Sequence, residues 1–278
     1  STPNPEKIGG TKATVGLGEL NTVRGDIRHA GFAGQWGYKF NIGSYGSNSW
    51  TKSRNKPIEE IAANEYEGLS REYSDVKNGL STSYANLRVD YNRMNGNVTT
   101  FEGGISEAQN QVFVTGIGRI QVDRVVRPWG RVSHTSDRYF IQADINGRKT
   151  LDEHQINLSK PTVLEKDSHF EEDSYDLKLQ FQNNFHMFEN RLRFVCGGSH
   201  KIQHVGTKNI LRCNTYTENQ SGLFAQLDYK LRPNVDLVGA ARLDRNTLHP
   251  TQLSPKFGMV YHYNKNNIFR ITCNRAFQ

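Results

Sequence analysis

Tyr175-Asp-Leu-Lys-Leu-Gln-Phe181 is the clearest copy of a pattern that recurs along the chain, in which apolar and polar residues alternate one by one. Successive side chains of a β-strand point to opposite faces, so this stretch separates an oily face from a charged face. Segments of roughly ten residues with this alternation have the length that a tilted strand needs to cross a membrane. The pattern therefore favours strands that lie between lipid and a polar interior.

The composition argues against two other classes of protein. A helical membrane protein needs continuous apolar runs of about twenty residues, and the sequence contains none. A soluble protein of 278 residues usually has a large core of Leu, Val and Ile, but this chain is only 35% hydrophobic, with a mean hydropathy of -0.70. Barrel strands around a polar lumen resolve this, because only every second residue must be apolar.

The pattern predicts an all-β protein, an antiparallel transmembrane β-barrel, with about thirteen strands in this chain. The strands are expected near residues 11–18, 22–30, 36–46, 82–94, 97–106, 126–135, 138–148, 174–185, 190–202, 221–231, 234–244, 253–263 and 267–277. Short turns containing Gly, Asn or Pro alternate with long polar connections, as in outer-membrane barrels. The long connections are expected at 47–81, 107–125, 149–173, 203–220 and 245–252.

Charged residues fall mainly on the polar face of these strands, which we assign to the lumen. A charged wall is costly unless it meets water or a polar plug, and a wide lumen supplies either. The predicted lumen-facing charges are Arg24, Asp26, Arg28, Arg88, Asp90, Asp144, Lys178, Asp228 and Arg242. Tyrosines and tryptophans near strand ends fit an aromatic girdle at the lipid interface; they are Tyr45, Trp50, Trp129, Tyr139, Tyr175, Tyr229, Tyr261 and Tyr263.

Several stretches resemble the barrel of TonB-dependent outer-membrane receptors. Residues 22–31 and 36–45 resemble the early strands of that barrel, and Leu253-Ser-Pro-Lys-Phe-Gly-Met-Val-Tyr261 with residues 269–277 resembles its middle. The resemblance implies a barrel of about twenty-two strands filled by a plug. We therefore expect residues 1–10 to be the end of the plug or its linker, and residues 11–278 to be part of the barrel. No plug or TonB box precedes Ser1, so the chain is expected to be a fragment.

The resemblance also implies a function and its partners. TonB-dependent receptors import bulky, scarce nutrients such as siderophores, haem, cobalamin or glycans across the bacterial outer membrane, with energy from TonB. The expected partners are the lipid bilayer, TonB acting through the plug and its TonB box, and an imported small molecule. Two alternatives stay open: a passive porin-type barrel or an outer-membrane enzyme on a smaller barrel, and a soluble β-rich module that binds glycans.

Sharper chemical signals are scarce. Weak ligand-binding candidates in the long loops are His154, His169, Phe170 and Tyr216. Cys196, His200 and His204 are spaced by four residues, but on a strand such positions lie about 13 Å apart, too far to share a metal ion. No catalytic motif or cofactor fingerprint occurs. The basic residues alternate with acids and do not form a patch suited to nucleic acid. We expect no enzyme activity, no cofactor, no metal and no nucleic-acid partner.

Overall fold

One antiparallel sheet contains nearly all of the described chain. The computed structural model describes residues 5–48, 79–93, 96–115, 118–151, 155–157, 172–206, 215–264 and 267–275. The elements are η1 (Pro5–Lys7), β1 (Gly10–Gly18), β2 (Thr22–Ala33), β3 (Trp36–Asn48), β4 (Gly79–Asn92), β5 (Val98–Thr115), β6 (Gly118–Thr135), β7 (Tyr139–Thr150), β8 (Gln155–Asn157), β9 (Asp173–Met187), β10 (Leu192–Val205), β11 (Tyr216–Arg232), β12 (Val235–Asn246), β13 (Gln252–His262) and β14 (Ile268–Asn274).

Each strand pairs with the next strand in the sequence. The order runs from β1 to β14 without a crossover, except that the short β8 pairs with β6 and leaves β7 to pair with β9. Thirteen strands thus lie on the main path of the sheet, which confirms the predicted all-β antiparallel architecture. Such a meander needs only local pairings, because each strand is joined to its neighbour by one hairpin.

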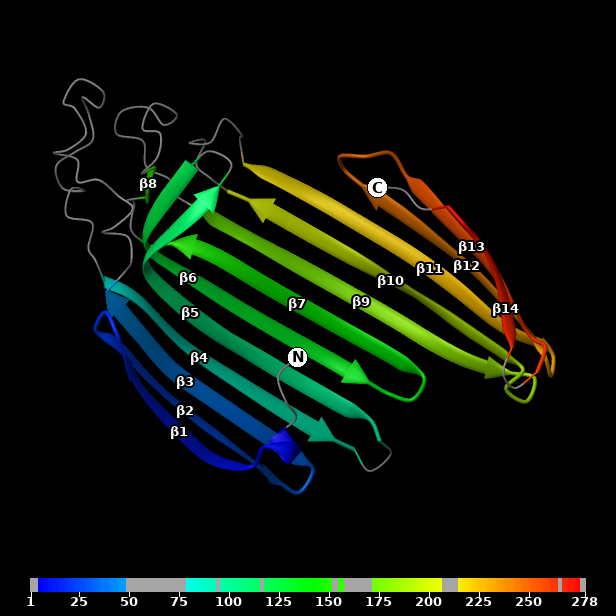
Figure 1. Cartoon of the computed structure of the whole chain (residues 1–278), viewed down its shortest axis with the longest axis horizontal. Coiled ribbons are helices and arrows are strands. Elements are labelled where there is room, and N and C mark those ends of the chain that lie inside the picture. Colours follow the sequence, from blue (N-terminus) through cyan, green and yellow to red (C-terminus); the bar gives the residue numbers. More distant parts are fainter. Residues whose placement is uncertain are drawn as a thin grey trace.

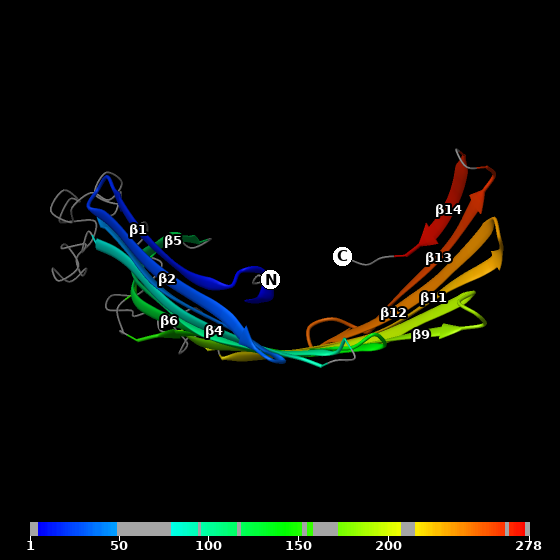
Figure 2. The ribbon, with the colours of Figure 1, turned by 90° about the horizontal axis from the view of Figure 1, so that it is seen from below.

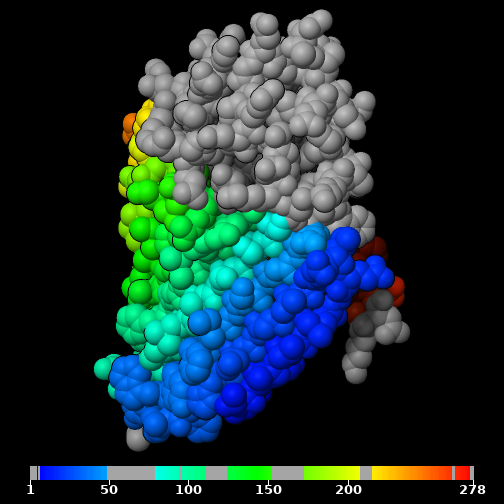
Figure 3. Space-filling view, turned by 90° about the vertical axis from the view of Figure 1, so that its left-hand side faces the viewer, coloured from blue at the N-terminus to red at the C-terminus, as the bar shows by residue number. Residues whose placement is uncertain are grey.

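The sheet is strongly curved and open. Figure 1 shows the strands running side by side, and Figure 2 shows that the sheet bends into a trough whose two edges are β1 and β14. The N-terminal element η1 lies on the concave side of this trough (Figure 2). The strands cross the molecule obliquely, as Figure 3 shows for β1 to β5. Curvature combined with strand tilt is the geometry that closes a sheet into a barrel.

Tight turns gather at one end of the strands. Gly34 and Gly96 have positive φ values of 59° and 81° at two of them, a backbone conformation that glycine adopts without steric cost. The turn between β9 and β10 uses three successive residues with positive φ, Phe188, Glu189 and Asn190. The opposite end carries the strand ends that flank the longest interval of sequence, Asn48 and Gly79, together with the short turn between β1 and β2.

The prediction was wrong for residues 107–125. This segment was expected to be a long loop, but β5 continues to Thr115 and β6 begins at Gly118. The pairing stays in register up to Thr115 and Gly118. Polar residues such as Glu107, Gln109 and Asn110 concealed the strand, because above the lipid both faces of a hairpin can be polar. The β-branched residues of Val112-Phe-Val114 and Ile120-Gln-Val122 indicate the strands better.

In a soluble protein apolar side chains are buried and charged side chains are exposed, and the two faces of this sheet show the reverse. Large apolar side chains are exposed on the convex face; Leu17 is 81% and Leu223 64% exposed. Charged side chains are buried on the concave face, where Asp90 is 2% and Asp144 8% exposed. Curvature contributes to this difference, because side chains crowd together inside a bend and spread apart outside it. Among the described residues no helix has the length and apolar character to cross a membrane.

Candidate functional site: the concave face

A row of charged side chains crosses the concave face perpendicular to the strands. Direct cross-strand pairing joins, in order, Lys39 to Arg88, Arg88 to Glu102, Glu102 to Arg131, Arg131 to Asp144 and Asp144 to Lys178. Residues directly opposite one another on neighbouring strands share a face. The register of the hairpins therefore converts charges far apart in the sequence into one contiguous row across β3, β4, β5, β6, β7 and β9.

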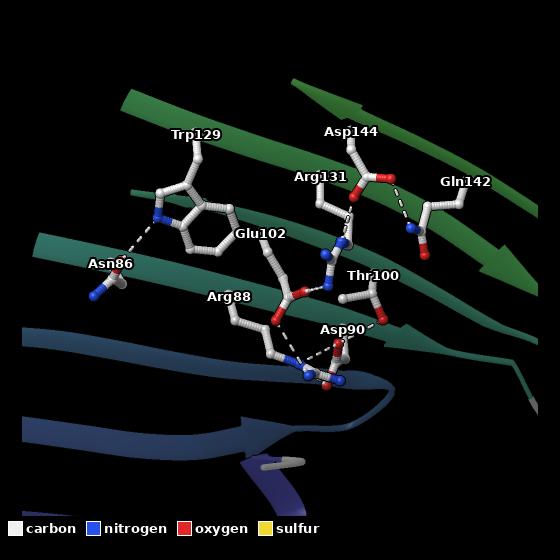
Figure 4. A network of polar contacts seen from close by, with 9 residues as sticks. All are labelled: Asn86, Arg88, Asp90, Thr100, Glu102, Trp129, Arg131, Gln142 and Asp144. Atoms are coloured by element: carbon white, nitrogen blue, oxygen red, sulfur yellow. Dashed lines mark hydrogen bonds and ion pairs between the residues drawn. The ribbon is translucent and has the colours of Figure 1, made fainter. Parts of the chain in front are cut away.

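The middle of this row is a connected network of ion pairs (Figure 4). Arg88 donates from Nε to both carboxylate oxygens of Asp90, at 2.9 and 3.0 Å, and from Nη1 to Glu102 at 3.3 Å. The Nη1 atom of Arg131 lies 3.6 Å from Glu102 Oε2, and its Nε donates to Asp144 at 2.6 Å. Each buried aspartate thus accepts a charge-assisted hydrogen bond from an arginine Nε, and Glu102 links the two arginines.

Neutral side chains donate further hydrogen bonds to the two buried aspartates. Thr100 Oγ1 donates to Asp90 Oδ1 at 2.8 Å, and Gln142 Nε2 donates to Asp144 Oδ2 at 2.7 Å. These donors come from the next row of the same face, since Asp90 pairs with Thr100 across the strands. The two carboxylates are therefore fixed in position as well as in charge.

Asn86 and Trp129 form a second polar contact over a glycine. Trp129 Nε1 donates to Asn86 Oδ1 at 3.2 Å, spanning the strand that lies between them (Figure 4). Gly104 is the residue between, and a Cβ there would collide with Asn86 Oδ1 and lie 2.7 Å from Trp129 Nε1. The indole reaches across β5 because Gly104 has no side chain.

The other predicted charges of the concave face lie on the expected side of their strands. Arg24 donates to Asp26 at 2.8 Å, Arg242 donates to Asp244 at 2.9 and 2.8 Å, and Arg193 lies 4.0 Å from Asp228. Their assignment to a lumen remains a prediction that rests on closure of the barrel. The sequence prediction omitted Glu102 and Arg131, although every second position on β5 and β6 identifies them.

The structure describes only one of the four ligand-binding candidates that the sequence suggested in the loops. His154, His169 and Phe170 lie outside the described residues. Tyr216 begins β11 and pairs with Val205; its hydroxyl lies 3.4 Å from Thr247 Oγ1. Its role as a ligand-binding residue remains a prediction.

Two residues assigned to the aromatic girdle belong to the opposite face. Tyr45 pairs with Arg24, and Trp129 contacts Asn86, so both side chains lie on the concave face. The prediction was wrong because nearness to a strand end does not fix the face, whereas parity does. Trp50 lies outside the described residues. The other girdle residues (Tyr139, Tyr175, Tyr229, Tyr261 and Tyr263) share the apolar face by parity.

Cys196, His200 and His204 all lie on the convex face of β10, four residues apart. His200 Nδ1 is 2.8 Å from Ser221 Oγ, and His204 Nδ1 is 2.9 Å from Thr217 Oγ1. His204 also stacks on Tyr175, with ring centroids 5.0 Å apart. Each histidine thus has a hydroxyl partner on the neighbouring strand, and the three side chains do not converge.

The end of the apolar belt is marked by ionic and polar contacts. On β5 Ile105 is exposed, and Glu107 follows it on the same face. Arg124 donates to Glu107 Oε1 at 2.6 Å and to Oε2 at 3.1 Å. These hydrogen bonds, with a further one from Gln109, hold the pKa of Glu107 below its usual range. An ion pair on the convex face is expected of strand residues beyond an apolar belt.

Comparison with known families identifies the fold. The profile described as "TonB dependent receptor-like, beta-barrel" matches residues 11–278. The chain belongs to this family. Its sheet therefore has the architecture of part of the wall of a TonB-dependent receptor barrel. This confirms the resemblance and the fold class inferred from the sequence.

Solved structures agree on the fold. The siderophore receptor PirA from Pseudomonas aeruginosa is 12% identical, with a TM-score of 0.58 over 88% of this chain and 37% of that chain. A variant of the ferric enterobactin receptor PfeA from Pseudomonas aeruginosa, in complex with enterobactin, is 13% identical, with a TM-score of 0.57 over 88% and 40%. PirA from Acinetobacter baumannii is 10% identical, with a TM-score of 0.56 over 93% and 42%.

The chain thus spans between 37% and 42% of the length of these three receptors. No curated protein sequence matches it. TonB-dependent receptors are outer-membrane transport proteins and not enzymes, and the barrel wall described here has the two faces that such proteins need.

Proposed function

We propose that this chain is the first part of the barrel of an outer-membrane receptor that imports a scarce nutrient with energy from TonB. The observation that carries the proposal is the pairing of an exposed apolar convex face with a buried ionic network on the concave face. A soluble module would expose Asp90 and bury Leu223, whereas a barrel wall does the reverse. In this proposal the protein resides in the bacterial outer membrane, and residues 1–10 link a plug to the barrel.

The concave face near the loop end supports one class of ligand. Arg24, Arg127 and Arg148 lie on this face together with three aromatic side chains, those of Tyr45, Tyr84 and Trp129. Arginine forks and aromatic rings suit an anionic chelate with aromatic groups, because guanidinium ions bind carboxylate or catecholate oxygens and stack on rings. The solved neighbours include siderophore receptors. We therefore propose a ferric siderophore as the imported ligand, in preference to haem, cobalamin or a glycan.

The test uses the full-length polypeptide, expressed in cells with and without TonB. We expect the outer membranes of both strains to bind the ferric siderophore, and only the strain with TonB to accumulate iron. A matched control is the same receptor with the proton gradient collapsed, which should bind ligand and import none. Uptake that continues without TonB would contradict active import and favour a passive porin-type barrel. A folded, monodisperse protein recovered in buffer without detergent would instead favour a soluble glycan-binding module.

A further inference from the structure

One buried charge on the concave face has no direct ion-pair or hydrogen-bond partner among the described residues. In the described part of the chain, three charged residues are less than a tenth exposed over the whole residue, Lys39 at 6%, Asp90 at 2% and Asp144 at 8%, and the side chain of Glu102 is 6% exposed. Arginines and neutral donors satisfy both aspartates, as shown above. Lys39 forms no hydrogen bond or ion pair with any described residue. An ammonium group removed from water without a partner is unfavourable, because the desolvation penalty is not offset.

Charges of both signs surround Lys39: Arg88 and Arg28 disfavour its ammonium, whereas Glu102 and Asp90 favour it. Lys39 pairs across the strands with Ala30 and Arg88, and Arg88 is already bound to Asp90 and Glu102. Arg28 lies on β2, two residues from Ala30, and its Nε atom is buried without a hydrogen-bond partner. Lys12 on β1 lies directly opposite Arg28. The nearest acid on β2, Asp26, is paired with Arg24.

Arg28 and Lys39 are diagonal neighbours on the paired strands β2 and β3 and offer two cationic groups on the same face of the wall. Arg28 supplies a planar fork that can grip both oxygens of a carboxylate, and Lys39 supplies a point charge beside it. Both side chains come from paired strands, so their backbones are fixed relative to each other by the ladder between β2 and β3. Rigid placement of donors is what distinguishes a binding site from a diffuse positive surface.

The location favours a protein segment as the occupant. The N-terminal segment of the chain lies on the concave side (Figure 2). There Pro5 packs on the same wall, because a Cβ at Gly37 would lie 3.5 Å from Pro5 Cβ and 3.7 Å from Asp90 Cβ. Gly37 is two residues from Lys39 on β3. The polypeptide itself thus covers this part of the wall, at the turn end of the strands and far from the loops that would collect a nutrient.

We propose that Arg28 and Lys39 bind a carboxylate side chain of the domain that fills the concave side of the barrel. This proposal rests on the proposed function, in which a plug occupies that space. The bound carboxylate neutralises the buried ammonium, satisfies the guanidinium of Arg28 and anchors the plug to the first strands of the wall. The site thus selects an acidic residue on the facing surface of the plug.

Zero-length cross-linking of the full-length protein in outer membranes tests this directly. A carbodiimide joins an amine to a carboxylate only where the two are in contact, and peptide mass spectrometry locates the bond. We expect an amide bond from Lys39 to an Asp or Glu outside residues 11–278, and its loss in the Lys39→Met variant. Cross-links from Lys39 to Asp90 or Glu102 alone would overturn the proposal, as would protection of Lys39 from acetylation by inorganic phosphate without any cross-link.

Hydrogen exchange of the plug gives a second measurement. Lys39→Met should make exchange in the contacting plug segment about tenfold faster, the order expected for loss of one charge-assisted hydrogen bond. The control Lys256→Met, on exposed wall of β13, should leave that exchange unchanged. Equal exchange in both variants would overturn the proposed contact with Arg28 and Lys39 while leaving the plug in place. A full-length protein with an empty lumen would instead refute the proposed function, so the two failures are distinguishable.

Discussion

An Arg-x-Asp motif occurs in two regions of the sheet, and its surroundings differ between them. Arg88-Val-Asp90 on β4 and Arg242-Leu-Asp244 on β12 both place an arginine and an aspartate two residues apart on the concave face. Nε to carboxylate distances are 2.9 and 3.0 Å in the first pair, and 2.9 and 2.8 Å in the second. The side chain of Asp90 is 2% exposed, however, and that of Asp244 is 24% exposed. Local geometry is shared, and burial is not.

The difference comes from the neighbours. Around β4 the adjacent strands contribute Glu102, Thr100 and Arg131 to one network, and the N-terminal segment packs nearby. Around β12 the adjacent β11 contributes Gly222 opposite Asp244, and β13 contributes Ser254 opposite Arg242. An ion pair with this geometry gains weight only where water is excluded and further groups complete it. The region around β4 is therefore the part of the wall where charge is structural.

Replacing the aspartate in each pair should give the largest effect and break the comparison most sharply. We expect Asp90→Leu to lower the free energy of unfolding by about 3–5 kcal/mol, because it leaves Arg88 buried with one carboxylate. Asp244→Leu, the matched control, should cost less than about 1 kcal/mol because that pair is exposed. Urea unfolding of the full-length protein in detergent micelles measures both. Equal losses would show that burial does not distinguish the two regions.

The residue between each pair tests the opposite face. Val89 and Leu243 are the middle residues of the two motifs, and by parity both lie on the convex face, which in the proposed function meets lipid. We expect Val89→Arg and Leu243→Arg each to cost about 2–4 kcal/mol at the bilayer midplane and less toward the interfaces. The two regions should therefore agree on the convex face where they differ on the concave one. The same urea titration checks this, and a negligible effect in both variants would contradict a lipid-facing surface.

Glycine substitution should separate the two regions by a smaller amount. A Cβ at Gly104 would lie 2.8 Å from the carbonyl oxygen of Ala85 and collide with Asn86 Oδ1, so Gly104→Ala must displace backbone. A Cβ at Gly222 would lie 2.7 Å from Arg242 Nη2 and Asp244 Oδ1, which are ends of flexible side chains. We expect a loss of about 1–3 kcal/mol for Gly104→Ala and below about 0.5 kcal/mol for Gly222→Ala. Fluorescence of Trp129 should change in the first variant alone.

Strands and faces could be predicted from the sequence because both follow from the period of two along a single segment. Residues 175–181 reveal their own faces without knowledge of any partner. The row from Lys39 to Lys178 could not be predicted in the same way, since it depends on the register of five successive pairings. Register is set by hairpin geometry and by which face is buried, and a one-residue slip reverses every side chain.

The burial of these charged side chains also could not be predicted from the sequence. Arg88-Val-Asp90 and Arg242-Leu-Asp244 are nearly identical in sequence, and nothing local distinguishes them. The contact between Trp129 and Asn86 was not predictable either, because it depends on a glycine in the strand between them. The face on which a residue lies could be predicted from the alternation within one strand. Contacts and burial depend on three neighbouring strands, so predicting them requires the pairing of the whole sheet.

The smallest expected effect concerns two carboxylates beyond the apolar belt, one in each region. Arg124 on β6 holds the pKa of Glu107 below its usual range. On β11, amide donors do the same for Glu218, first Gln220 at 2.7 Å and then Asn246. Because both folded-state pKa values are lowered, each contact stabilises the fold above the unfolded pKa, and this stability is lost as pH falls through the folded pKa. Each should contribute below about 1 kcal/mol.

Salt then distinguishes the two carboxylates. The Glu107 contact is with a cation, so added salt should raise its pKa toward the ordinary value, whereas the amide contacts of Glu218 should respond weakly. Carboxyl-carbon NMR titration of both residues at low and high salt measures this, and Arg124→Gln is the matched control that should make Glu107 behave like Glu218. A salt response of equal size at the two sites would show that the β5–β6 contact is not governed by its ion pair. Exposed charge would then be equivalent in both regions, and burial alone would account for the special character of the wall around β4.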